Sequence, residues 1–127
     1  MHITFKTIAL KNPRQSEAPA KYYADIIGNG KTTFDDLAKY ASAMSTVSKA
    51  DILAVMEITF SKIAEDVADG KIVYVGEYFT LQAGGSSEPR ETAEQVDASC
   101  FKSIRTIFRP SRLIKNALKL STLLKKN

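Results

Sequence analysis

The sequence has almost none of the residues that thiol and transition-metal chemistry require. Its 127 residues include one cysteine, Cys100, one histidine, His2, and no tryptophan. A single cysteine forms no internal disulfide, and one histidine with one cysteine makes no metal-ligand set. A lone thiol without a histidine base is a poor nucleophile, so we interpret Cys100 as a small packing residue. We therefore expect no enzyme activity, no catalytic residue, no metal and no cofactor.

Long apolar runs are also missing. No stretch approaches the roughly 20 apolar residues that span a bilayer. The first residues, Met1 to Lys6, lack the charged-then-apolar order of a secretory signal. These features favour a cytoplasmic protein without a membrane partner, and the length suits one domain with one core.

Acidic residues are absent from the last part of the chain. The net charge of +4 divides into +2 for residues 1–44, −3 for 45–82, −3 for 83–98 and +8 for 99–127. A cluster of one sign repels itself unless it meets a polyanion or an acidic surface. A solvated basic helix and tail is the alternative interpretation of the same cluster.

A long amphipathic helix is predicted at the centre of the chain. Apolar residues recur at steps of three and four from Ile52 to Val67, which is the spacing of one helix face. Ser48 is suited to cap the first turn, and Gly70 to end the helix, because glycine readily takes the left-handed conformation. A shorter helix is predicted from residue 33 to 44.

Two strands are predicted after this helix, at residues 71–75 and 78–81, with Gly76 between them. From residue 82 to 87 the core signal disappears, which predicts a protruding loop. Residues 84–97 contain too few apolar side chains to offset the entropy of ordering, so we expect this arm to be mobile.

Both ends of the chain also contain periodic segments. Residues 2–10 alternate like a half-buried strand, whereas residues 21–24 are compatible with an extended or a helical piece. Residues 101–109 alternate again, and the face predicted to point outward is basic. That face comprises Arg105, Ile107 and Arg109, and the face predicted to lie on the core comprises Ile104, Thr106 and Phe108. Proline at 110 ends the strand, and a closing helix is predicted up to Leu124.

The order of these elements resembles the HU and integration-host-factor family of bacterial histone-like proteins. The resemblance covers Thr32 to Leu124 and includes Asp69-Gly70-Lys71, Gly76, the long arm and Phe108-Arg109-Pro110-Ser111. The additional strand before it, with Pro19-Ala20-Lys21-Tyr22-Tyr23, is similar to the N-terminally extended HU-like proteins of Bacteroides-type bacteria.

The resemblance implies an α+β, HU-like fold with a helix pair, a three-stranded antiparallel sheet with a protruding arm, a C-terminal helix and an added N-terminal strand. It implies an N-terminal extension, residues 1–31, and an HU-like domain, residues 32–127. It also implies a homodimer, or a heterodimer with a related subunit, that binds double-stranded DNA in the nucleoid with low sequence specificity. The expected backbone-binding side chains are Lys102, Arg105, Arg109, Arg112, Lys115 and Lys119.

Two alternatives remain at this point. A winged-helix regulator would place the helix that begins at Ser48 in the major groove, but the polar face of that helix is net negative, which disfavours contact with DNA. An HU-like structural or protein-interaction dimer that has lost DNA binding is favoured by the acidic arm and by the added N-terminal segment. In that arm the only proline, Pro89, lies among acids and would be repelled by phosphate.

Overall fold

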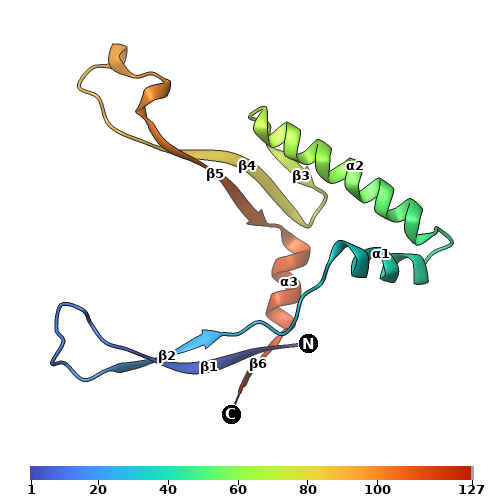
Figure 1. Cartoon of the computed structure of the whole chain (residues 1–127), viewed down its shortest axis with the longest axis horizontal. Coiled ribbons are helices and arrows are strands. Elements are labelled where there is room, and N and C mark those ends of the chain that lie inside the picture. The colour runs from blue at the N-terminus through green and yellow to red at the C-terminus, as the bar shows by residue number, and fades with distance from the viewer. Residues whose placement is uncertain (127) are drawn as a thin grey trace. The chain divides into compact units, whose positions relative to one another are not determined.

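The computed structural model describes residues 1–126, whose contacts divide the chain into two units. Residues 1–33 together with 117–126 form the first, which we call the hairpin unit. Residues 34–116 form the second, which we call the arm unit. The architecture is α+β, with the predicted helix pair, three-stranded antiparallel sheet and closing helix (Figure 1).

The hairpin unit contains a three-stranded sheet in the order β2-β1-β6. The predicted first strand is β1 (His2–Leu10), and β2 (Lys21–Ile26) pairs antiparallel to it. Residues 21–24, for which the sequence allowed an extended or a helical conformation, are therefore extended. The last strand, β6 (Thr122–Lys125), runs parallel to β1. The predicted continuation of the closing helix to Leu124 is therefore wrong, because the free edge of β1 offers backbone groups that this segment satisfies as a strand.

The helix pair of the arm unit follows the sequence closely. It consists of α1 (Phe34–Ala43) and α2 (Lys49–Ala68). The backbone N–H of Asp51 donates to Ser48 Oγ at 3.2 Å, which confirms the predicted cap. Gly70 has a φ of +81°, as expected for a glycine that ends a helix.

Few side chains of the described chain are fully buried. Among its hydrophobic residues only Ala38 and Cys100 are buried. Phe34 of α1 packs on Phe60 of α2 with ring centroids 5.2 Å apart, yet Phe60 remains 39% exposed. No residue of α2 is fully buried. One copy of the chain therefore leaves much of the predicted apolar stripe uncovered.

The second sheet consists of β3 (Val73–Val75), β4 (Phe79–Ser87) and β5 (Phe101–Pro110) in that order, all antiparallel. We call the paired residues 82–87 of β4 and 101–107 of β5 the stem of the arm. The helix α2 contacts β3 and β4 (Figure 1). The prediction that the strand ends near Leu81 is wrong. β4 continues for six residues to Ser87, because its backbone groups pair with β5 along this whole length.

Two glycines explain why the core signal is absent from this part of β4. A Cβ atom at Gly84 would lie 2.4 Å from Cδ1 of Ile107, and one at Gly85 would lie 2.8 Å from Cδ1 of Phe101. Side chains of β5 therefore occupy the space above both glycines. The apolar atoms of the stem come from β5, so residues 82–87 themselves show no apolar pattern.

We expect Gly85→Ala to destabilise the protein by about 1–3 kcal/mol, because the new methyl group would meet both the Phe101 ring and, at 3.2 Å, the carbonyl oxygen of Ser103. Gly28→Ala is the matched control, since nothing lies within 4 Å of a Cβ at that position. Urea unfolding of both variants measures the difference. Equal midpoints for the two variants would show that the stem tolerates the methyl group.

The end of the arm contains two short 3₁₀ turns, η1 (Ala93–Gln95) and η2 (Ala98–Cys100). η1 lies within residues 84–97, the segment predicted to be mobile, and that mobility stays a prediction. Cys100 is 2% exposed, and its Sγ lies 3.9 Å from the carbonyl oxygen of Gln95. This burial confirms that Cys100 is a packing residue.

The closing helix is α3 (Arg112–Leu120). Its start is held on the turn between β3 and β4, where the N–H of Ser111 donates to the carbonyl oxygen of Tyr78 at 2.7 Å. The division between the two units falls inside this helix. The predicted domain boundary after residue 31 stays a prediction, and residue 127, at which the predicted HU-like domain ends, lies outside the described residues.

Candidate DNA-binding surface

The basic face of β5 is set by the register of the sheet. Arg109 pairs with Thr80 and Arg105 with Gly84, so the two arginines, four residues apart, lie on the same face. The opposite face contains Phe108 and Ile104, which are 54% and 78% exposed. The predicted alternation is confirmed, but the prediction of which face is covered is wrong for this single copy. Ile107, on the face expected to point outward, is half-buried over Gly84, whereas Ile104 and Phe108, which packs on Phe79, remain exposed.

The two arginines differ in their surroundings. Nη1 of Arg105 donates to Ser86 Oγ on β4 at 3.0 Å, which orients its guanidinium along the stem. Arg109 is exposed and forms no ion pair within residues 1–126. Its guanidinium can therefore contact an external anion without first breaking an internal salt bridge.

The basic residues of α3 lie at intervals of three and four residues, so they share one helix face. Arg112, at the first position, forms a salt bridge with Glu77. Lys115 and Lys119 are exposed and form no ion pair within the described part of the chain. The N–H of Leu113 donates to the carbonyl oxygen of Glu77 at 3.1 Å, so Glu77 helps to fix the beginning of the helix.

Lys102 belongs to a different environment from the other predicted residues. It has no partner in the register of β4 and β5, because the pairing shifts between Ser86 and Ser87. Its Nζ lies 3.7 Å from Glu88, which also meets Arg90 at 3.6 Å. Lys102 is therefore engaged by the acidic end of the arm.

The structure thus places the six predicted residues in three settings. Arg105 and Arg109 share the face of β5, while Lys102 joins the ion pairs at the end of the arm. The other three lie on one face of α3. Two neighbours that orient basic side chains were missed, Ser86 and Glu77, because their contacts span 19 and 35 residues of sequence.

The resolved pKa shifts belong to a pair outside this surface. Near the end of α2, the hydrogen-bonding contact of Lys62 lowers the pKa of Asp66 from its ordinary value, and Asp66 in turn raises the pKa of Lys62. The two groups are 3.1 Å apart, and Lys71 approaches the same carboxylate at 3.6 Å. Since the pKa of Asp66 is lower in the folded state, the pair stabilises the folded helix end at neutral pH. This stabilisation is lost as the pH falls and the Asp66 carboxyl becomes protonated.

We expect limited trypsin digestion to cut first after Arg90. Residues 88–92 form no helix or strand, whereas β4 is paired up to Ser87 and a 3₁₀ turn begins at Ala93. The ion pair of Arg90 with Glu88 is a surface contact worth little. Mass spectrometry of early fragments identifies the site. First cleavage at Lys102 would show instead that the paired stem opens before the arm tip.

Other kinds of site receive no support from the described residues. Within residues 1–126, no three histidine, cysteine or carboxylate side chains come together in a way that could hold a metal ion. None of the helices in this range is both long and apolar enough to cross a membrane.

A known structure shares this fold. A candidate bacterial DNA-binding protein from Bacteroides vulgatus ATCC 8482 superimposes with a TM-score of 0.65 at 13% sequence identity. The match covers 96% of this chain and 47% of the other, so the chain spans about half the length of that protein. At this identity the likeness concerns the fold alone. No curated protein matches the sequence.

Sequence comparison is more specific. The sequence pattern of the family described as "HU domain fused to wHTH, Ig, or Glycine-rich motif" matches residues 1–125. The match includes the N-terminal strands as well as the helix pair, the second sheet and the arm. The chain therefore belongs to this HU-domain family, as its order of elements predicted.

Proposed function

We propose that this chain is a non-enzymatic, nucleoid-associated protein that binds duplex DNA through its phosphate backbone with little sequence preference. The observation that carries the proposal is the set of exposed cations on β5 and α3. Arg109, Lys115 and Lys119 have no internal ion-pair partner within residues 1–126, so phosphates can neutralise them with release of counterions. Arg105 is already oriented by Ser86.

The same proposal includes a dimer, either of two identical chains or with a related subunit. One copy leaves the apolar side chains of the arm unit largely uncovered, and none of the residues of α2 is fully buried. Exposed apolar residues are spread over the arm unit, including Val55 and Ile58 on α2 and Phe108 on β5. Burying such faces in an intertwined interface would cover this apolar surface, as obligate dimers do.

A second candidate function is an HU-like dimer for protein interaction that has lost DNA binding. The observation in its favour is the acidic end of the arm, where Glu88 engages both Arg90 and Lys102. An arm that repels phosphate cannot insert its proline as a wedge between base pairs. The proposed backbone binding does not need such an insertion.

Electrophoretic mobility of a random-sequence duplex at low salt separates the two candidates. We expect retardation that is reversed by added salt and that is the same for duplexes of different sequence. A chain that leaves the mobility unchanged at micromolar concentration would refute the DNA-binding proposal and favour the interaction dimer.

A further inference from the structure

The positive charge of the chain is concentrated in the hairpin unit. Residues 1–33 and 117–126 carry eight basic and two acidic side chains, a net charge of +6. Residues 34–116 carry ten basic and twelve acidic side chains, a net charge of −2. The unit that contains β5 and the start of α3 therefore has no excess of positive charge, whereas the hairpin unit has a large one.

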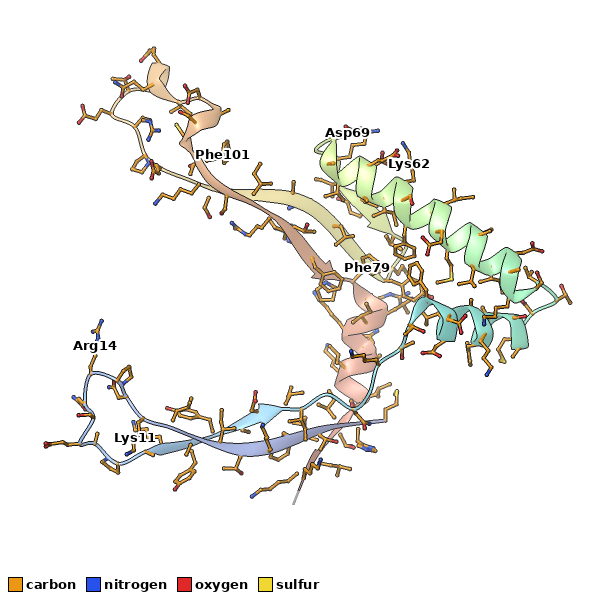
Figure 2. All side chains as sticks on the ribbon, in the orientation of Figure 1. Lys11, Arg14, Lys62, Asp69, Phe79 and Phe101 are labelled. Atoms are coloured by element: carbon orange, nitrogen blue, oxygen red, sulfur yellow. The ribbon has the colours of Figure 1, made fainter. Side chains whose placement is uncertain are left out.

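The connection between β1 and β2 is built from two hydrogen-bonded turns. The carbonyl oxygen of Asn12 accepts from the N–H of Gln15 at 3.0 Å, and the Asn12 side chain accepts from the N–H of Arg14 at 3.0 Å. Pro13 restricts the backbone between them, and the N–H of Ala18 closes the second turn on Gln15 at 3.0 Å. Figure 2 shows Arg14 projecting from the end of this hairpin.

The cations of the hairpin are exposed and unpaired. Lys11 and Arg14 lie in the connection, and Lys21 begins β2, opposite Leu10. None of the three forms an ion pair within residues 1–126, whereas Lys102 and Arg112 of the arm unit do. Glu17 is the single acid between Lys11 and Lys21. The hairpin end, residues 11–21, therefore carries a net charge of +2, and within the described residues none of its three cations is held in an ion pair.

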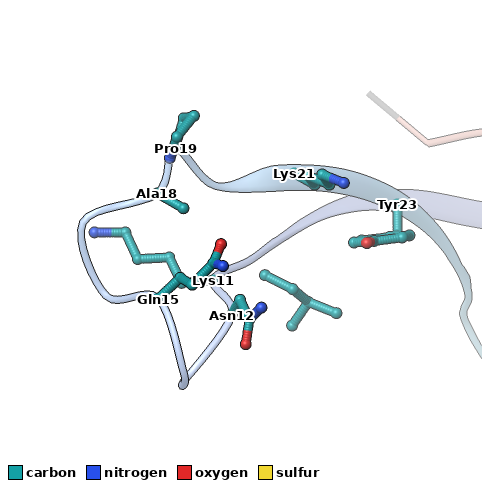
Figure 3. Close-up of a pocket in the computed structure, with 8 residues that line it drawn as sticks. Lys11, Asn12, Gln15, Ala18, Pro19, Lys21 and Tyr23 are labelled. Atoms are coloured by element: carbon teal, nitrogen blue, oxygen red, sulfur yellow. The ribbon is translucent and has the colours of Figure 1, made fainter.

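A hollow of about 340 Å³ lies inside the hairpin connection (Figure 3). Its lining includes the ammonium-bearing side chains of Lys11 and Lys21 and the amide side chains of Asn12 and Gln15. Ammonium groups are donors only, and amide groups offer two donors each, which suits the acceptor oxygens of a phosphodiester. Since a water molecule occupies about 30 Å³ in the liquid, the hollow has room for a hydrated phosphate group.

We propose that the β1–β2 hairpin is a second DNA-contacting element, in which Lys11, Arg14 and Lys21 bind backbone phosphates of the duplex. The proposal rests on the proposed function and adds a surface outside β5 and α3. The pre-formed turns lower the entropy cost of presenting Arg14. Side chains that contact phosphates carry no base information, so the hairpin adds affinity for every sequence.

The test compares two triple variants of the full-length chain that lose the same charge. One is Lys11→Gln with Arg14→Gln and Lys21→Gln. The matched control is Lys49→Gln with Lys62→Gln and Lys71→Gln, which removes lysines that already pair with acids in the arm unit. Fluorescence anisotropy with a random-sequence duplex is measured across a salt series, and circular dichroism checks that each variant keeps the wild-type secondary structure.

For each phosphate contact removed, we expect the slope of log affinity against log salt concentration to become shallower by about 0.9 in the hairpin variant. Its affinity near 0.1 M salt should fall by about tenfold for each of these contacts. The control should change affinity by about twofold or less. Arg14→Lys, which keeps the charge, should bind like the wild type.

The outcomes separate this proposal from the proposed function. A hairpin variant that binds like the wild type, or no more weakly than the control, overturns the hairpin proposal while leaving backbone binding in place. If Arg105→Gln with Arg109→Gln leaves affinity unchanged while the hairpin variant loses it, the hairpin proposal stands and the β5 surface is refuted. A wild-type chain that binds no duplex overturns both.

Discussion

At micromolar concentration the chain is expected to sediment as a dimer, and its unfolding midpoint is expected to rise with protein concentration. The reason is the apolar surface that one copy leaves uncovered, including α2, on which no residue is fully buried, and Ile104, which is 78% exposed. Each large apolar side chain buried contributes roughly 1.5–3 kcal/mol. A monomer lacks that contribution, so dissociation and unfolding should occur together.

Phe60→Ala tests where the interface lies. In one copy Phe60 contacts Phe34 but is 39% exposed, so truncation within a monomer should cost less than the full cavity penalty. If the partner subunit completes the burial, the loss should reach about 3–5 kcal/mol and shift the protein to unfolded chains. Tyr74→Ala is the control, because Tyr74 is 74% exposed and pairs with Thr80 on the Arg109 face. A folded monomer in sedimentation would refute the dimer.

The logarithm of DNA affinity is expected to fall linearly with the logarithm of salt concentration, with a slope near −0.9 for each phosphate that the protein neutralises. Arg109→Ala should reduce the slope by about one unit per subunit and weaken all sequences alike, because Arg109 is exposed and has no internal ion pair within residues 1–126. Fluorescence anisotropy across a salt series measures both effects.

Pro89→Ala is the control for this mechanism. Pro89 lies between Glu88, which is tied to Arg90 and Lys102, and the further acid Glu91. The substitution should therefore leave both affinity and DNA bending unchanged, as measured by energy transfer between labelled duplex ends. A salt-independent affinity would refute the phosphate mechanism. A bend lost with Pro89→Ala would show that the acidic end of the arm inserts into DNA after all.

Local sequence was sufficient wherever the stabilising contacts are local. The cap at Ser48 is a bond to a residue three positions away, and the helix ends at Gly70 because of the backbone preference of that one residue. The order of the elements, which survives large changes in side chains, also identified the HU-domain family. The alternation of β5 predicted that Arg105 and Arg109 share a face, since the period of a strand is two.

Tertiary structure decided the features whose partners are distant in sequence. β4 extends to Ser87 because β5 supplies both its hydrogen bonds and the side chains that fill the space above Gly84 and Gly85. The chain end forms β6 because β1, more than a hundred residues earlier, offers a free edge. The contact of Arg105 with Ser86 depends on the same strand pairing. Sequence determined which residues prefer helix, strand or turn, whereas backbone pairing across the chain determined where the strands end and which basic side chains stay free.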